Sequence, residues 1–335
     1  MACRSYQTAH LKVDTEIPRR LLAAADAPPP HPKRLFRTRV PRLRARRVTW
    51  NMRTAAQCRK PIFAMTDIDC LVFGRAFEGS YDAVAWPRRL KTIEFHWDSR
   101  FNQPIDLVQW PASLQRLEFG PCFNQPVEGA KFPVSLQELL FCGDSKLNQP
   151  IEEVLLPSSV RDLFGLGRMG GSFNQRIEGV AWPPSLEHLE FGESFNQPIE
   201  RVAWPTSLQE LTFGNTFNQP VEGTVWPDSL EKLVFGEKFN QPVDNVRWPA
   251  SLQEVAFGSY DEVFNKNAMV MFSEFNQSIG SSGWPASLKR LTLGQKFRQS
   301  LQGPTSKRYV FLTGVVIHKT IAFSAESNGR KVFMS

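Results

Sequence analysis

The side chains that most often carry chemistry are few and scattered in this sequence. The five histidines fall in different segments, and none has a Cys or Ser partner at a recognisable spacing: His10, His31, His96, His188 and His318. The five cysteines contain no Cys-x-x-Cys pair. Because a zinc site needs clustered ligands and a catalytic triad needs a nucleophile beside a base, we predict no metal, no catalytic residue and no enzyme activity.

One short stretch matches a nucleotide-binding fingerprint. Residues 165–170, with the sequence GLGRMG, fit the pattern G-x-G-x-x-G and follow a predicted strand. Such a loop binds pyrophosphate only when a helix begins inside it, so that backbone amides and the helix dipole meet the phosphates. A new copy of a repeated motif begins at Phe173 instead. We therefore interpret the glycines as a four-residue bulge and predict no cofactor.

The positive charge of the chain is concentrated near its amino end. Residues 1–60 contain 15 of the 40 basic residues but only three of the 33 acidic ones, a net charge of +12. The remaining residues contain 25 basic and 30 acidic side chains, a net charge of −5. Eight basic residues stand within residues 33–47, after a run of three prolines: Lys33, Arg34, Arg37, Arg39, Arg42, Arg44, Arg46 and Arg47.

This composition predicts a disordered basic arm over residues 1–60, because unbalanced charge and proline oppose a packed core. A basic arm can also bind phosphates, so a nucleic-acid-associated protein is the alternative function that the sequence leaves open. Asp14 and Glu16 argue against an organelle presequence, which should be poor in acids. We expect a cytoplasmic protein, with the nucleus as the alternative location, and no membrane span.

The rest of the chain is a repeat. The block Phe-Asn-Gln-Pro-Ile at residues 101–105 returns eight times, and the spacings between successive copies are 22, 24, 26, 22, 22, 22, 36 and 22 residues. Within each unit, apolar positions alternate with variable ones, as in Leu211-Thr212-Phe213, which is the period of a short strand. Frequent Pro and Gly leave no room for several helical turns.

These features predict a mainly β fold: a solenoid of about nine to ten 22-residue coils over residues 61–303, with parallel strands stacked about 4.8 Å apart. A second extended segment is expected to end near Trp204-Pro205 in its unit. Seven of the nine tryptophans precede proline, in a slot that otherwise holds Phe132 or Leu156, so we place this slot in the core. Residues 304–335 are assigned to a carboxyl-terminal cap or tail.

A repeated asparagine requires a separate explanation. It occupies one slot in eight units: Asn102, Asn124, Asn148, Asn174, Asn196, Asn218, Asn240 and Asn276. An amide inside a coil is costly unless its donors and acceptor are used. We therefore predict an inward-facing asparagine ladder in which each side chain bonds turn backbone in its own and the next coil, while the following Gln faces outward and contributes little.

The pattern F-N-x-P-I/V, followed by W-P-x-S-L-x-x-L-x-F-G, resembles the FNIP repeat family, a branch of the leucine-rich-repeat superfamily. The resemblance implies a leucine-rich-repeat-like arc whose sheet lines one face, a role in protein–protein interaction, and no catalytic residues. The sequence departs from the pattern at a few positions: Leu147 in place of Phe, Gly165 in place of the strand Phe, and Arg176, Ser278 and Ser300 in place of Pro.

Parallel coils align their outward side chains into columns, and such columns are where binding specificity should lie. The column between the two inward strand residues has a partly apolar stretch next to a largely charged column that contains His188. We expect a protein partner to dock on five residues here: Leu140, Phe164, His188, Thr212 and Val234. The same residues would also suit a solvated sheet that binds nothing.

Residues 259–274 add 14 residues between two coils. Insertions in repeat arrays form loops, and loops often carry binding residues. The run of residues 269–272 would make a small contact patch. Residues 264–267 instead look like a decayed repeat start, which would make the segment a failed repeat, and we favour this second interpretation slightly.

Overall fold

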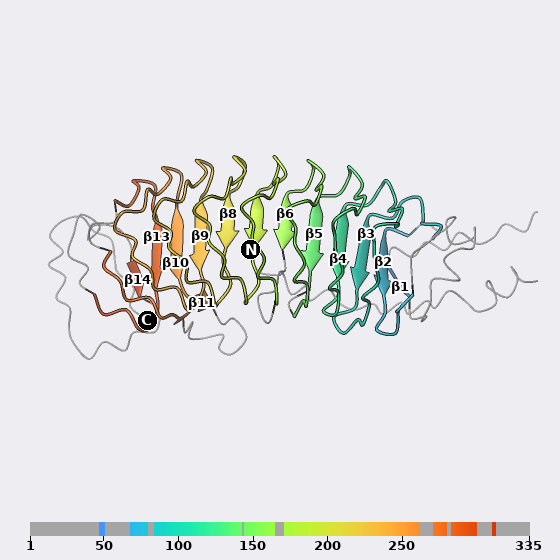
Figure 1. The fold of residues 1–335 in the computed structure, drawn as a ribbon, viewed down its shortest axis with the longest axis horizontal. Helices are drawn as coiled ribbons and strands as arrows, with labels where there is room; N and C mark the ends of the chain where they lie inside the picture. The colour runs from blue at the N-terminus through green and yellow to red at the C-terminus, as the bar shows by residue number, and fades with distance from the viewer. Residues whose placement is uncertain are drawn as a thin grey trace, which may run out of the picture.

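The computed structural model describes residues 47–50, 68–79, 84–142, 144–164, 171–260, 271–279, 283–299 and 310–312. In these ranges the chain is a parallel β-solenoid, as predicted, in which each coil contributes one short strand to a single sheet (Figure 1). The sheet has twelve strands in chain order: β1 (Arg47–Trp50), β2 (Cys70–Phe73), β3 (Thr92–Phe95), β4 (Arg116–Phe119), β5 (Glu138–Phe141), β6 (Asp162–Phe164), β7 (His188–Glu190), β8 (Glu210–Thr212), β9 (Lys232–Phe235), β10 (Glu254–Phe257), β13 (Arg290–Leu293) and β14 (Val310–Leu312).

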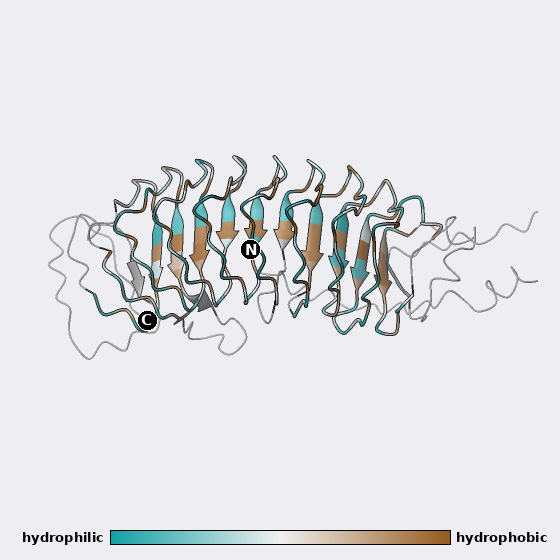
Figure 2. Ribbon diagram, in the orientation of Figure 1, coloured by the Kyte–Doolittle hydropathy of each residue, from teal (hydrophilic) through white to brown (hydrophobic). Residues whose placement is uncertain are grey.

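The strands alternate between outward and inward positions. In β3, β4 and β9 the second and fourth residues are buried while the first and third are half-buried. Figure 2 shows that several of the strands, β8 among them, begin with a hydrophilic residue and continue with a hydrophobic one. The segment before Trp204-Pro205 forms no strand, so the second extended segment of each coil is not a second sheet.

The core consists of stacked rings from successive coils. Phe195, Phe217 and Phe239 are fully buried, and their ring centroids are 6.1 and 6.0 Å apart. The tryptophan slot lies at the boundary of the same core: Trp204, Trp226 and Trp248 stack at 6.4 and 6.5 Å and are more than nine-tenths buried. Stacking at every coil gives each unit the same aromatic contacts with its neighbours, as a one-dimensional array requires.

The asparagine ladder is present, but the prediction that it points inward is wrong. Asn102 and Asn148 are exposed, and the other six amides are half-buried. The preceding Phe and the following Ile or Val fill the core at this turn, as Phe195 and Ile199 do, so the amide lies at the surface. There the Oδ1 of Asn196 accepts the backbone N–H of Asn218 at 2.9 Å.

The following glutamine, predicted to contribute little, is the second half of the ladder. Gln219 Nε2 donates to both the backbone oxygen and Oδ1 of Asn196, at 3.0 and 3.1 Å. The same three bonds join Asn102 to the next coil and continue, coil by coil, to Arg298 and Gln299. The ladder is therefore formed by asparagine and glutamine together.

A serine ladder runs parallel to it and was not predicted. The hydroxyl of Ser229, in the W-P-x-S-L motif, donates to the backbone oxygen of Leu208 in the previous coil at 2.7 Å. Ser207 and Ser251 make the same bond to Leu186 and Leu230. Because this serine recurs at the repeat interval, the sequence did contain a signal from which the serine ladder could be predicted.

The predicted amino-terminal boundary of the solenoid needs correction. Strand β1 lies inside residues 1–60 and pairs in parallel with β2, so the prediction of a disordered arm is wrong for Arg47–Trp50. Strand β14 lies beyond residue 303 and pairs with β13. The repeat period does not reveal β1, because β1 is not followed by the Phe-Asn-Gln-Pro motif, whereas β14 lies within the residues assigned to a cap or tail. The rest of the predicted arm lies outside the described residues.

The insertion does not add a coil to the main sheet. Strands β11 (Ser259–Tyr260) and β12 (Met271–Phe272) pair with each other in antiparallel fashion, and β10 pairs directly with β13. Residues 264–267, on which the interpretation as a failed repeat rests, lie outside the described residues. In the described ranges, no helix has the length and apolarity needed to cross a membrane.

Candidate interaction surface

The outward face of the sheet carries two columns of side chains, and their register is as predicted. The first column runs from Arg47 on β1 through Arg116, Asp162 and His188 to Arg290 on β13. In the second column, Glu94 is paired with Glu118 and then Leu140, and further along Thr212 is paired with Val234 and Ala256. On this face most residues have a fixed neighbour on the next strand, and the second column is interrupted between Phe164 on β6 and Glu190 on β7.

The charges of the first column pair with each other across adjacent strands. His188 Nδ1 lies 2.5 Å from Asp162 Oδ1, and Lys232 Nζ lies 3.4 Å from Glu210 Oε2. Arg290 lies 3.2 Å from Glu254. Direct cross-strand partners are within reach of each other in a sheet, so opposite charges there neutralise locally. The charged column is therefore a series of ion pairs rather than a field of one sign.

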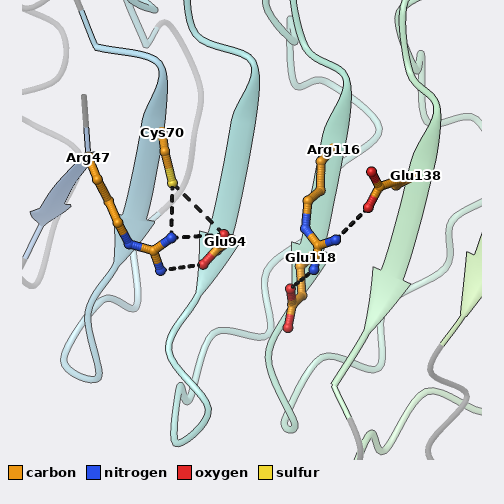
Figure 3. Close-up of polar contacts among 6 residues, drawn as sticks. All are labelled: Arg47, Cys70, Glu94, Arg116, Glu118 and Glu138. Carbon is orange, nitrogen blue, oxygen red and sulfur yellow. Dashed lines mark hydrogen bonds and ion pairs between the residues drawn. The ribbon is translucent and has the colours of Figure 1, made fainter. Parts of the chain in front are cut away.

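A denser polar cluster covers the face at β1 to β5 (Figure 3). The guanidinium of Arg47 reaches past Cys70 to bind both carboxylate oxygens of Glu94, at 2.6 and 3.2 Å. Arg116 contacts Glu118 on its own strand at 2.8 Å and also pairs with Glu138 on β5. Sequence reasoning had placed Arg47 in the arm and had not predicted that it binds Glu94, because the two residues lie two strands apart.

The Cys70 thiol in this cluster is a poor nucleophile near neutral pH. Burial, together with the negative charge of Glu94, raises the pKa of the Cys70 thiol to about 12. A thiol is nucleophilic only as its thiolate, which Cys70 does not form near neutral pH. Across the ranges that the structure covers, no group of three or more His, Cys, Asp or Glu side chains is arranged to hold a metal ion.

The predicted docking residues do not form one continuous apolar stripe. Thr212 and Val234 are half-buried and adjacent in the second column, and His188 lies in the first column, paired with Asp162. Leu140 follows Glu118 and is only 7% exposed. The backbone of Phe164 continues the second column next to Leu140, and its side chain lies outside the described part of the structure, as do residues 165–170.

Comparison with protein families agrees with this geometry. The FNIP Repeat family matches residues 123–164, 173–216 and 217–260. The chain carries FNIP repeats. The matched ranges 173–216 and 217–260 are each two 22-residue spacings long and begin at the repeat Phe that opens a coil, so the family motif follows the coils of the solenoid. No curated protein sequence matches the FNIP-repeat chain.

Solved structures place the FNIP solenoid among leucine-rich-repeat-like folds. The crystal structure of CroV588, described as a novel circular LRR protein, is 38% identical over 69% of this chain, with a TM-score of 0.59. The match spans 31% of the length of the CroV588 chain. Two further structures match at lower similarity. The pneumococcal vaccine antigen PcpA is 13% identical over 74% of this chain and 73% of its own, with a TM-score of 0.24. A leucine-rich repeat protein from Bacteroides ovatus is 14% identical over 68% of this chain and 60% of its own, with a TM-score of 0.16.

Proposed function

We propose that this FNIP-repeat chain is a non-enzymatic scaffold that binds a protein partner through the outward face of its sheet. The observation that carries the proposal is the central part of the second column. Thr212 and Val234 are half-buried and follow one another on β8 and β9 without a charge, and Ala256 continues the column on β10 with only 6% of its surface exposed. The Glu210–Lys232 and Glu254–Arg290 ion pairs flank them.

This arrangement has the composition of a protein interface. Interfaces combine a core depleted in charge with a polar rim, and pairing within the rim limits the desolvation cost of covering it. The neutral strip is narrow, and its side chains stand at fixed spacing on a rigid sheet. A partner with an extended or helical segment of small apolar side chains would fit it best.

The test is capture and direct titration with the full chain. Val234→Glu places a charge in the middle of the neutral strip, and Thr206→Glu adds the same charge at an exposed turn outside the sheet. Proteins captured from lysate by the unmodified chain should bind the Thr206→Glu variant equally well and the Val234→Glu variant at least tenfold more weakly. Circular dichroism and thermal unfolding of both variants would check that each is folded.

Two outcomes would overturn the proposal. The first is equal binding of all three proteins to every captured partner. The second is recovery of nucleic acid alone, released by salt and nuclease, which would favour the phosphate-binding role of the basic residues near the amino end.

A further inference from the structure

A row of apolar side chains is exposed on the solenoid away from the sheet. Leu155, Ala181, Ala203 and Val225 occupy the same position in four consecutive coils, and all four are exposed. Leu155 is 83% exposed and Val225 is 78% exposed. Isolated apolar residues on a surface are normal, but a contiguous row indicates a contact surface. We call these four residues the apolar row.

A row of acidic side chains lies three residues before it in each coil. Seven consecutive coils carry a carboxylate in this slot: Asp106, Glu128, Glu152, Glu178, Glu200, Glu222 and Asp244. The turn around each is the same, because a backbone bond of 3.1–3.3 Å joins the residue before the carboxylate to the residue two after it, as in Val202 to Ile199. We call these seven residues the acidic row.

The acidic row places negative charges in register on neighbouring coils, where like charges repel each other. Near one end of it, a hydrogen bond that the protonated Glu128 donates to Glu153, together with the negative charge of Glu153, raises the pKa of Glu128. Four cations lie on the same turns and offset only part of the charge: Lys131, Arg176, Arg201 and Arg247. With Glu153, the carboxylates number eight against these four. A ligand for this edge should therefore be basic and should carry apolar side chains for the adjacent row.

The chain itself contains a segment of that chemistry. Residues 33–46 hold seven Lys or Arg and no acid, interleaved with four apolar side chains: Leu35, Phe36, Val40 and Leu43. The segment ends at the residue before β1, which is parallel to β2. The amino end of β1 therefore lies at the edge of the sheet where the other strands begin (Figure 1). In each coil the Pro-x-Ser turn leads directly into the strand, and the turn that carries the acidic row precedes it by one short extended segment, as residues 200–201 precede residues 206–207.

The extended length of residues 33–46 is sufficient to cover the distance from β1 to β9. Eight strand steps separate β1 from β9, the strand that follows Val225, which at about 4.8 Å per step is roughly 38 Å. Fourteen extended residues span about 46 Å. We propose that residues 33–46 lie along this edge, with their basic side chains on the acidic row and with Leu35, Phe36 and Val40 on the apolar row. For these residues the proposal replaces the expectation of a disordered arm, and it does not depend on the sheet-face proposal.

The test follows tryptic cleavage within residues 33–46 of the full chain, by mass spectrometry. Two exposed acidic-row residues are neutralised in Glu178→Gln/Glu200→Gln, and two acids outside the row in the control Glu231→Gln/Glu237→Gln. Because each exposed ion contact contributes little, we expect cleavage about three- to tenfold faster in the first variant than in the unmodified chain or the control. Raising the salt from low to high concentration should accelerate cleavage of the unmodified chain in the same way.

A second pair of variants tests the apolar row. Leu155→Ser should also accelerate cleavage, whereas Val134→Ser, at a position 87% exposed outside the row, should not. Equal cleavage rates in all five proteins, at both salt concentrations, would overturn the proposal. Protection that increases with protein concentration would also overturn it, because the occupant would then be the segment of a second copy.

Discussion

His188 on β7 and Asp162 on β6 are direct cross-strand partners, and their side chains are joined by a 2.5 Å contact between Nδ1 and Oδ1. The hydrogen bond to Asp162 raises the pKa of His188, although burial acts in the opposite direction. Glu210 and Glu187 also favour the charged ring. The pair therefore couples the stability of the sheet face to pH.

The sign of this coupling follows from the raised pKa. The stabilisation is fully present below about pH 6.5, the pKa of an unfolded histidine, and is lost as the pH rises through the higher folded value. We expect His188→Gln to destabilise the protein by about 0.5–1 kcal/mol at pH 5.5 and by much less at pH 8.5. Denaturant unfolding of the unmodified protein and the His188→Gln variant at the two pH values would measure this loss of stability. A stability difference between the two proteins that does not change with pH would contradict the prediction.

The thiol of Cys70 should be unusually unreactive. With a pKa of about 12, its thiolate fraction at pH 8 is on the order of a thousandfold below that of an ordinary cysteine. Iodoacetamide labelling, followed by peptide mass spectrometry, would measure the rate. Glu94→Gln should accelerate labelling, because Glu94 contributes to the raised pKa. Labelling of Cys70 at the rate of free cysteine would show that the thiol is not buried in solution.

The amide ladder predicts graded effects of two neighbouring substitutions. Asn196→Leu removes the acceptor for Asn218 N and Gln219 Nε2, and we expect it to cost about 1–3 kcal/mol, reduced where water replaces the bonds. Gln197→Leu removes a donor to Asn174 and should cost less, about 0.5–1 kcal/mol. Thermal unfolding of both variants would measure this order. No effect at Gln197 would mean that the ladder depends on asparagine alone.

Two glycines should differ sharply in their tolerance of alanine. A Cβ at Gly236 would overlap the backbone oxygen of Gly214 in the previous coil. A Cβ at Gly179 would make only an ordinary contact, 3.6 Å from Glu152. We expect Gly236→Ala to destabilise by more than about 2 kcal/mol and Gly179→Ala to change stability by about 0.5 kcal/mol or less. Similar melting temperatures for the two variants would show that coils at Gly236 can move apart.

The strand register could be predicted from the sequence because it depends on a simple alternation. Leu211 and Phe213 had to face the core, so Thr212 had to face outward, and stacking at the repeat interval then fixed its neighbours. The face of Asn196 could not be predicted this way. Asn196 and Gln197 lie in a segment between two turns that has no strand alternation, and both recur equally, so recurrence alone does not distinguish a buried amide from a surface one.

The polar contacts of the sheet face were partly predictable for a similar reason. Register places Asp162 beside His188, and their pairing follows from charge. Arg47 lies outside the 22-residue repeat pattern. The repeat spacing therefore could not predict the strand that contains Arg47 or its bond to Glu94. The apolar row was visible in the sequence at Leu155 and Val225, but its exposure depends on the turn that precedes it.

The ladder also indicates where this protein tolerates changes in length. Its bonds continue without a break across spacings of 24, 26 and 36 residues, between Asn124 and Asn148, Asn148 and Asn174, and Asn240 and Asn276. In each case the extra residues fall between the end of a strand and the next Phe or Leu of the repeat. One long edge of the solenoid thus accepts insertions while the opposite edge keeps a constant length. New peptide segments, whether acquired in evolution or grafted by design, should be accommodated at the carboxyl ends of the strands without disturbing the stacking of the coils.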